Sequence, residues 1–121
     1  MTGPATVQPP DIVSMRAATV RLLHPDATPD VLPPADAEVE TLTAVLRDHV
    51  KALAPMVRRE AEQLSAESIP RYYALACVND ALVRLRSQPE PGRYGGLVYA
   101  RRLARALSAL CDRYEALTRT P

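Results

Sequence analysis

The chain has 121 residues, of which 47% are apolar and 24% are charged, and its formal net charge is +1 at pH 7. This length and composition are typical of one globular domain with a single modest core. The near-neutral charge gives no reason to expect nucleic acid or an anionic membrane as a partner. No run of about 18 apolar residues is present, so no membrane-spanning helix is expected.

The N-terminal stretch "MTGPATVQPPD" lacks the basic segment and apolar core of a signal peptide, so we expect a cytoplasmic protein. In that compartment Cys77 and Cys111 are predicted to be free thiols. They form no CxxC motif and have no histidine cluster beside them, so neither a metal site nor a cofactor is expected. Residues 1–10 are rich in proline and threonine and are predicted to be a disordered tail.

A short helix is predicted over residues 11–23, with Asp11 as its N-cap and a stripe of apolar side chains at helical spacing. Residues 24–35 follow and contain four prolines. Each proline removes a backbone donor and restricts the residue before it, so this segment is predicted to be a linker or an ordered loop.

Residues 36–118 are predicted to form a bundle of three long helices. The first of them extends from Asp36 to Leu64, with Asp36 as its N-cap and a kink at Pro55. The next begins at Ser65 or Ser68. Apolar spacing predicts that the following side chains of this helix point inward: Tyr72, Leu75, Ala76, Val78, Leu82, Val83 and Leu85.

The last helix, "LVYARRLARALSALCDRYEAL", has the most regular apolar stripe, which includes Tyr99, Leu103 and Leu107. The turn "PGRYGG" that precedes it does not have the spacing of a phosphate-binding loop, and an interhelical turn is predicted instead. No segment alternates apolar and polar residues as a strand does. The fold class is therefore predicted to be all-α, a small antiparallel helical bundle with a short N-terminal helix.

Three polar residues fall within predicted apolar arcs: His49, Glu60 and Asn79. A buried unpaired polar group costs about 1–3 kcal/mol, so each needs a partner, a water or a ligand. One interpretation is packing at the edge of the core; the other is a ligand-binding pocket inside the bundle, with Tyr72 and Tyr99 beside them. In the second case His49 is the candidate acid or base, although it lies roughly 16 Å from Glu60 along one helix.

Arg101, Arg102 and Arg105 form a basic patch on the last helix. Nucleic-acid binding would require more basic surface and interleaved aromatic residues, so a solvated helix face is the simpler interpretation. Neither cysteine has a neighbouring base in the sequence that would make it a nucleophile.

Three stretches resemble a known group of proteins: "LRDHVKALAP" (Leu46–Pro55), "IPRYYALACVNDALVRLR" (Ile69–Arg86) and "YARRLARALSALCDRYEAL" (Tyr99–Leu117). Over residues 34–118 the chain is similar to a family of small uncharacterised actinobacterial proteins, some of them labelled natural-product biosynthesis proteins of unknown function. The resemblance implies an association with secondary metabolism and brings no functional residues with it.

These observations favour a non-catalytic accessory or binding protein. It would bind a second copy of itself, a protein partner or a small apolar ligand through the helical bundle. Two alternatives remain open at the level of sequence. One is a cofactor-free enzyme that acts on a natural-product intermediate in a bundle-core pocket, and the other is a regulator that contacts nucleic acid through its arginines.

Overall fold

The computed structural model describes residues 9–23 and 34–119. Four helices account for most of these residues, and no strand is present among them. The elements are α1 (Ile12–Leu23), α2 (Asp36–Glu62), α3 (Ile69–Arg86) and α4 (Gly95–Thr118). The predicted all-α bundle is confirmed. The predicted disordered tail and most of the predicted linker over residues 24–35 lie outside the described residues.

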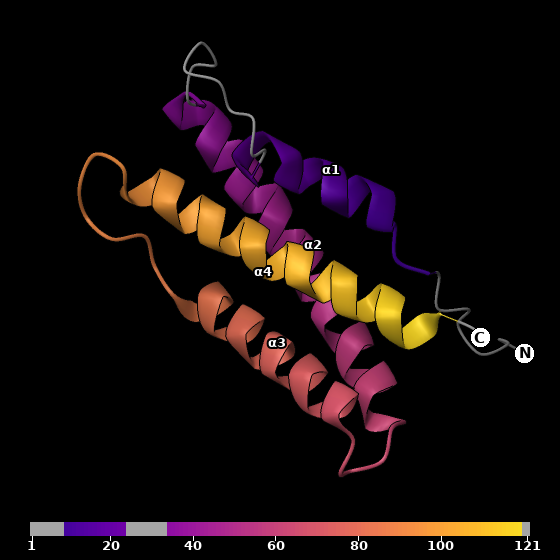
Figure 1. Cartoon of the computed structure of the whole chain (residues 1–121). Coiled ribbons are helices and arrows are strands. Elements are labelled where there is room, and N and C mark those ends of the chain that lie inside the picture. Colours follow the sequence, from indigo (N-terminus) through magenta and orange to yellow (C-terminus); the bar gives the residue numbers. More distant parts are fainter. Residues whose placement is uncertain (1–8, 24–33, 120–121) are drawn as a thin grey trace, which may run out of the picture.

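Helix α4 is the centre of the bundle, because it contacts each of the other three helices. Figure 1 shows α4 in front of α2, with α1 and α3 on opposite sides of it. Helix α2 packs along α4 and α3, whereas α1 and α3 do not contact each other within the described part of the chain. The core is therefore a three-helix unit of α2, α3 and α4, with α1 added on the far side of α4.

The core consists mainly of leucine, valine and alanine side chains from α2, α3 and α4, and Met15 and Leu22 of α1 join it. Its largest fully buried side chains are these: Leu46, Leu53, Leu103, Leu107, Leu110, Val50, Val57, Val78 and Cys111. Full burial of a leucine or valine side chain contributes about 1.5–3 kcal/mol, so this cluster supplies most of the driving force for folding.

Helix α1 is held to the bundle by apolar burial and by surface ion pairs. Met15 and Leu22 are buried in the shared core. Arg16 forms ion pairs with Asp112, at 2.8 Å, and with Glu115 on α4. Hydrogen bonds to Glu115 and Asp112 raise the pKa of the Arg16 guanidinium further above its ordinary value. These ion pairs are partly exposed, and such pairs contribute about 0–1 kcal/mol each, so burial dominates.

The helix termini follow local sequence signals, with one exception. The Asp11 carboxylate accepts a hydrogen bond from the Ser14 backbone N–H at 3.0 Å, as predicted for an N-cap. Ser68 caps α3 by accepting a hydrogen bond from the Arg71 N–H at 3.2 Å. The prediction for Asp36 was wrong, because Ala35 is the N-cap of α2 and Asp36 is the first helical residue.

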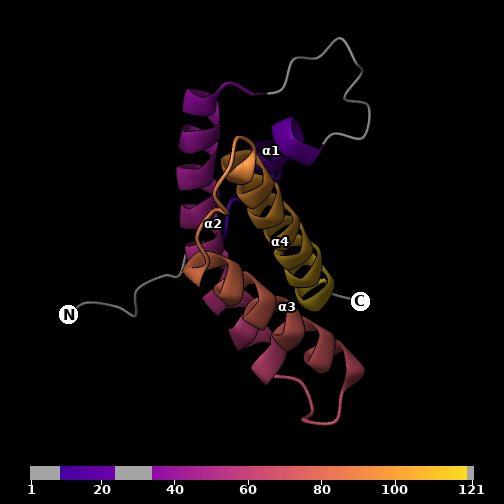
Figure 2. The ribbon, with the colours of Figure 1, turned by 90° about the vertical axis from the view of Figure 1, so that its left-hand side faces the viewer.

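Pro55 lies inside α2, which stays helical from Asp36 to Glu62, two residues short of the predicted end. Proline has no N–H to bond the carbonyl four residues earlier, so a bend is expected there. Figure 2 shows that the two halves of α2 run in different directions. The lower half leans along α3, so this bend helps α2 to contact both α3 and α4.

The side of α3 that faces the core agrees with the predicted one only in part. Val78 is buried as predicted, and the predicted Leu75, Leu82 and Leu85 pack partly buried against the core. Ala74, Val78 and Ala81 are fully buried, whereas Tyr72 and Val83, which were predicted to point inward, are 71% and 52% exposed. Ala76 is also exposed. The prediction failed because α3 has apolar residues on two sides, so periodicity alone could not select between them. The core side is the one with small alanines, which allow α3 to pack closely against its neighbours.

Candidate functional site

The polar residues singled out from the sequence occupy separate places in the structure. Asn79, predicted to lie inside the bundle, is exposed on α3. His49 and Glu60 are half-buried on α2. His49 lies close enough to Asp11 for its charge to help lower the pKa of that carboxyl group, although the hydrogen bonds from Ser14 are the larger cause. The structure therefore does not bring His49, Glu60 and Asn79 together.

Tyr99 is the one predicted site residue that is buried, with 5% of its surface exposed. Its hydroxyl accepts a hydrogen bond from Arg47 Nη1 at 2.6 Å and donates one to the Arg84 carbonyl oxygen at 2.8 Å. The Arg84 carbonyl belongs to the last turn of α3, where it also accepts a hydrogen bond from the Ser87 backbone N–H at 3.2 Å. Tyr99 thus joins α2, α3 and α4 through one hydroxyl group.

We expect Tyr99→Phe to lower the free energy of unfolding by about 1–3 kcal/mol, because the half-buried Arg47 and the Arg84 carbonyl lose a shared partner. Tyr114→Phe is the matched control, since Tyr114 is half-buried on the same helix and its hydroxyl makes no hydrogen bond among the described residues. Urea unfolding followed by circular dichroism measures both variants. Equal decreases in the free energy of unfolding of the two variants would show that the hydrogen bonds of the Tyr99 hydroxyl do not stabilise the fold.

The two cysteines are not activated for nucleophilic chemistry. Cys111 is fully buried, and burial raises the pKa of its thiol to about 11. Burial also raises the pKa of the half-buried Cys77 thiol. A reactive cysteine needs a lowered pKa, so both thiols stay protonated near neutral pH. No group of three or more histidine, cysteine or acidic side chains that could hold a metal ion is found among residues 9–23 and 34–119.

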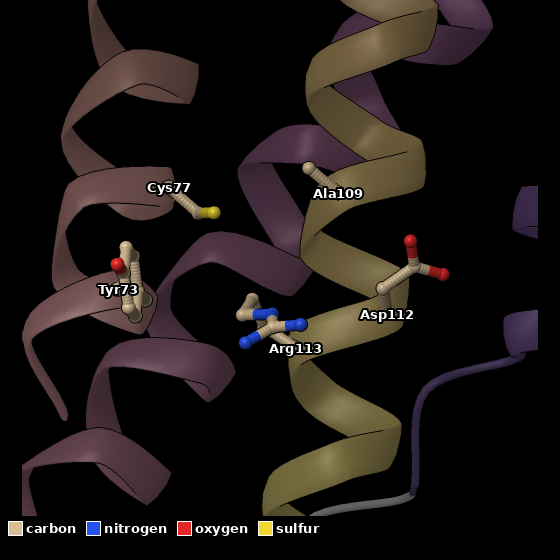
Figure 3. Close-up of a pocket in the computed structure, with 5 residues that line it drawn as sticks. All are labelled: Tyr73, Cys77, Ala109, Asp112 and Arg113. Carbon is tan, nitrogen blue, oxygen red and sulfur yellow. The ribbon is translucent and has the colours of Figure 1, made fainter. Parts of the chain in front are cut away.

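A groove follows the seam between α3 and α4 and contains two adjoining shallow cavities. The first, of about 410 Å³, is lined by Tyr73, Cys77, Ala109, Asp112 and Arg113. Figure 3 shows Cys77 and Arg113 directed into the space between the helices, whereas Asp112 points to the other side of α4. Asp112 is directed there because it pairs with Arg16.

The second cavity in the groove, of about 310 Å³, shares the lining residue Ala109 with the first, so the two adjoin there. It is lined by residues of both helices: Asp80, Arg84, Arg102, Arg105, Ala106 and Ala109. Arg102 and Arg105 belong to the basic patch predicted from the sequence. Arg84 was not predicted as a member, because a residue from another helix enters such a patch only through the fold.

Two further cavities lie elsewhere on the surface. One, of about 470 Å³, is between the starts of α2 and α4 and includes Val39, Tyr94 and Leu97. The other, of about 160 Å³, is beside Pro55 and Leu82. None of these four cavities is lined by a residue of the predicted ligand site, which comprised His49, Glu60, Tyr72, Asn79 and Tyr99.

The outward side of α3 is an apolar and aromatic surface, which we call the α3 face. It consists of these residues: Ile69, Tyr72, Tyr73, Ala76, Asn79, Asp80 and Val83, all of them exposed. Ile69 is 68% exposed. The rings of Tyr72 and Tyr73 contact each other edge to face, with their centroids 5.7 Å apart. A helix with apolar residues on both sides is normally covered on both sides.

The fold and the surface together define the class of protein: a small all-α bundle with an exposed apolar helix face and a groove beside it. No helix that could cross a membrane is found among the described residues. The model of a family of unknown function, DUF6415, matches residues 13–119, and the chain belongs to that family. No curated protein and no solved structure matches the chain.

Proposed function

We propose that the protein is a non-catalytic binding protein that forms a homodimer through the α3 face. The observation that supports this proposal is the distribution of apolar residues on α3, where Ala74, Val78 and Ala81 are covered by the bundle while Ile69, Tyr72 and Val83 are left in solvent. Large apolar side chains gathered on one exposed helix face are typical of protein–protein contacts.

The pattern of residues on α3 favours a second copy of the chain as the occupant. In a twofold dimer the same surface serves both partners, so it must complement itself when the helices run antiparallel. With the axis at Ala76, residues that are equally far from it on either side lie opposite one another. Ile69 then faces Val83 of the second copy, and the small Ala76 faces its equivalent.

The same arrangement places Tyr72 opposite Asp80 of the second copy. These two side chains complement each other, because the tyrosine hydroxyl is a donor and the carboxylate is an acceptor. Asp80 lies on the edge of the face, where it also pairs with Arg84 at 3.5 Å. The twofold axis repeats the Tyr72–Asp80 contact, so two such hydrogen bonds flank the central alanines.

The size of the α3 face limits the strength of this dimer. Helix α3 has 18 residues and is therefore about 27 Å long. A single helix pair of that length is at the small end of specific interfaces. We therefore expect a dissociation constant on the order of 10 µM rather than a permanent dimer.

Sedimentation equilibrium on the wild type and on two valine variants tests the proposal. The wild type should approach twice its 13.2 kDa mass as concentration rises, whereas Val83→Glu should stay monomeric, because the antiparallel pairing buries the introduced carboxylate against Ile69. Val13→Glu is the matched control, since Val13 is 81% exposed on α1. This variant should dimerise like the wild type. A monomeric wild type at roughly 500 µM, or equal weakening in both variants, would rule out the α3 face.

We also propose that the dimer acts in the cytoplasm as an accessory protein in natural-product biosynthesis. The resemblance of residues 34–118 to actinobacterial proteins with that label supports this role. Metabolite profiles of a strain that lacks the gene test it: the lost product should return with the wild-type gene and not with the Val83→Glu gene. An unchanged profile after deletion would contradict the role. The bundle-core enzyme would need His49 within reach of Glu60 or Asn79, so we place it second.

A further inference from the structure

The groove between α3 and α4 contains a local excess of positive charge. The cavity at Arg84, Arg102 and Arg105 contains three arginines and one acidic residue, Asp80. Three positive charges less one negative charge leave +2 around a space of about 310 Å³, in a chain whose whole formal charge is only +1. Like charges this close repel each other in the free protein, and an anion removes that repulsion.

Few acidic side chains neutralise these arginines. Asp80 pairs with Arg84 at 3.5 Å, and both side chains are partly exposed. Arg102 and Arg105 form no ion pair among the described residues, and both side chains are exposed at the rim of the cavity. Guanidinium groups from two different helices thus surround one opening, where they can donate several hydrogen bonds to a carboxylate, sulfonate or phosphate.

The other end of the groove has a different character. Beyond Ala109 the lining includes the Tyr73 ring and the side chains of Cys77 and Arg113. Asp112 also lines this cavity, but its carboxylate points to the other side of α4, where it pairs with Arg16. This cavity, of about 410 Å³, is within the range of small-molecule sites. Ala109 lines both cavities and Ala106 lines the arginine end, so small side chains lie where the two cavities adjoin.

We propose that the α3–α4 groove binds a small organic anion, with its acidic group at Arg84, Arg102 and Arg105 and its apolar body along Ala109, Cys77 and Tyr73. This site differs from the pocket inside the bundle that was one interpretation of the sequence, because it lies on the surface and requires a charged ligand. The groove shares Tyr73 and Asp80 with the α3 face, whereas the central dimer residues Ile69, Ala76 and Val83 line neither cavity of the groove.

Two fluorescent probes of similar shape, one anionic and one neutral, test the site. The sulfonate 8-anilinonaphthalene-1-sulfonate should bind to the wild type, and the double variant Arg102→Gln, Arg105→Gln should raise its dissociation constant at least tenfold, because two charge-assisted contacts are lost. Neutral N-phenyl-1-naphthylamine, which lacks the acidic group, should bind more weakly and respond less than twofold to the same change.

The matched control removes the same total charge elsewhere. Arg59→Gln, Arg86→Gln neutralises two exposed arginines that line none of the four cavities, and it should change sulfonate affinity less than twofold. Bound sulfonate should also slow the alkylation of Cys77 by iodoacetamide, which places the probe in the groove. The proposal is overturned if the sulfonate does not bind, if both double variants weaken it equally, or if Cys77 reacts at an unchanged rate.

Discussion

Leu107→Ala is expected to lower the free energy of unfolding by about 3–4 kcal/mol, in the middle of the range for truncation of a core leucine. Leu107 is fully buried on α4, the helix that contacts all three others. The substitution removes apolar contacts and leaves a cavity that close-packed neighbours fill only in part. A domain of this size has a total stability of roughly 5–12 kcal/mol, so this one change removes a large fraction of it.

Leu117→Ala is the control for this prediction, because it makes the same chemical change on the same helix at a half-buried position near its end. We expect it to cost about 1 kcal/mol or less. Thermal and urea unfolding of the two variants measure the difference. Similar losses in both would mean that α4 is not the centre of the packed core.

Gly95→Ala is expected to lower the free energy of unfolding by about 2–3 kcal/mol, as overpacking against a rigid group does. A Cβ atom at position 95 would lie 1.8 Å from the Glu90 carbonyl oxygen. That oxygen belongs to the backbone and has no rotamer to change, so the whole turn between α3 and α4 must shift. The same turn contains Gly92, whose φ of 118° is strained for any other residue.

The adjacent Gly96 provides a control, because its replacement by alanine should change the free energy of unfolding in the opposite direction. A Cβ at Gly96 would lie 3.7 Å from Val39 Cγ1, which is an ordinary contact. Gly96 is within the first turn of α4, so Gly96→Ala should stabilise the protein by up to about 1 kcal/mol through its helix propensity. Chemical unfolding of the two alanine variants decides the point, and a destabilised Gly96→Ala or a neutral Gly95→Ala would contradict the geometry of this turn.

The strongest amphipathic patterns predicted the fold correctly. The stripe of Tyr99, Leu103 and Leu107 on α4 is buried, and α2 begins at the predicted residue. In both helices the apolar residues occupy one side, so the periodicity leaves no choice of which side faces inward. Asp11 caps α1 as predicted, and Ser68, one of the two residues predicted to begin α3, caps that helix, because a cap depends on contacts only three residues apart.

The candidate site could not be predicted in the same way. On α3 both sides are apolar, and the helical wheel selected the side of Tyr72 and Val83, which is exposed. This choice also placed Asn79 in the interior, where it does not lie. Sequence spacing does not record how closely two helices can approach, and in this bundle the small Ala74 and Ala81 decided the orientation.

The basic groove was missed for a different reason. Arg102 and Arg105 were visible as neighbours on one helix, but Arg84 reaches them only because α3 packs beside α4. Arg101, the third member of the predicted patch, does not line the groove. A site made by two helices depends on their pairing and rotation, which no single-helix pattern contains.

The proposed dimer depends above all on the twofold contact at Ala76. Antiparallel helices with alanines at the contact approach to about 8 Å between axes, which places the two facing Cα atoms about 4–6 Å apart. That separation suits a disulfide bond. An Ala76→Cys variant should therefore cross-link to its equivalent, provided that the native cysteines are replaced (Cys77→Ser, Cys111→Ala).

Non-reducing electrophoresis after mild oxidation measures this cross-link directly. We expect Ala76→Cys to give a covalent dimer of twice 13.2 kDa as the main species. Ala52→Cys, which is exposed on α2, should stay largely monomeric in the same background. Equal and slow cross-linking of both variants would show that the α3 face does not meet its own copy.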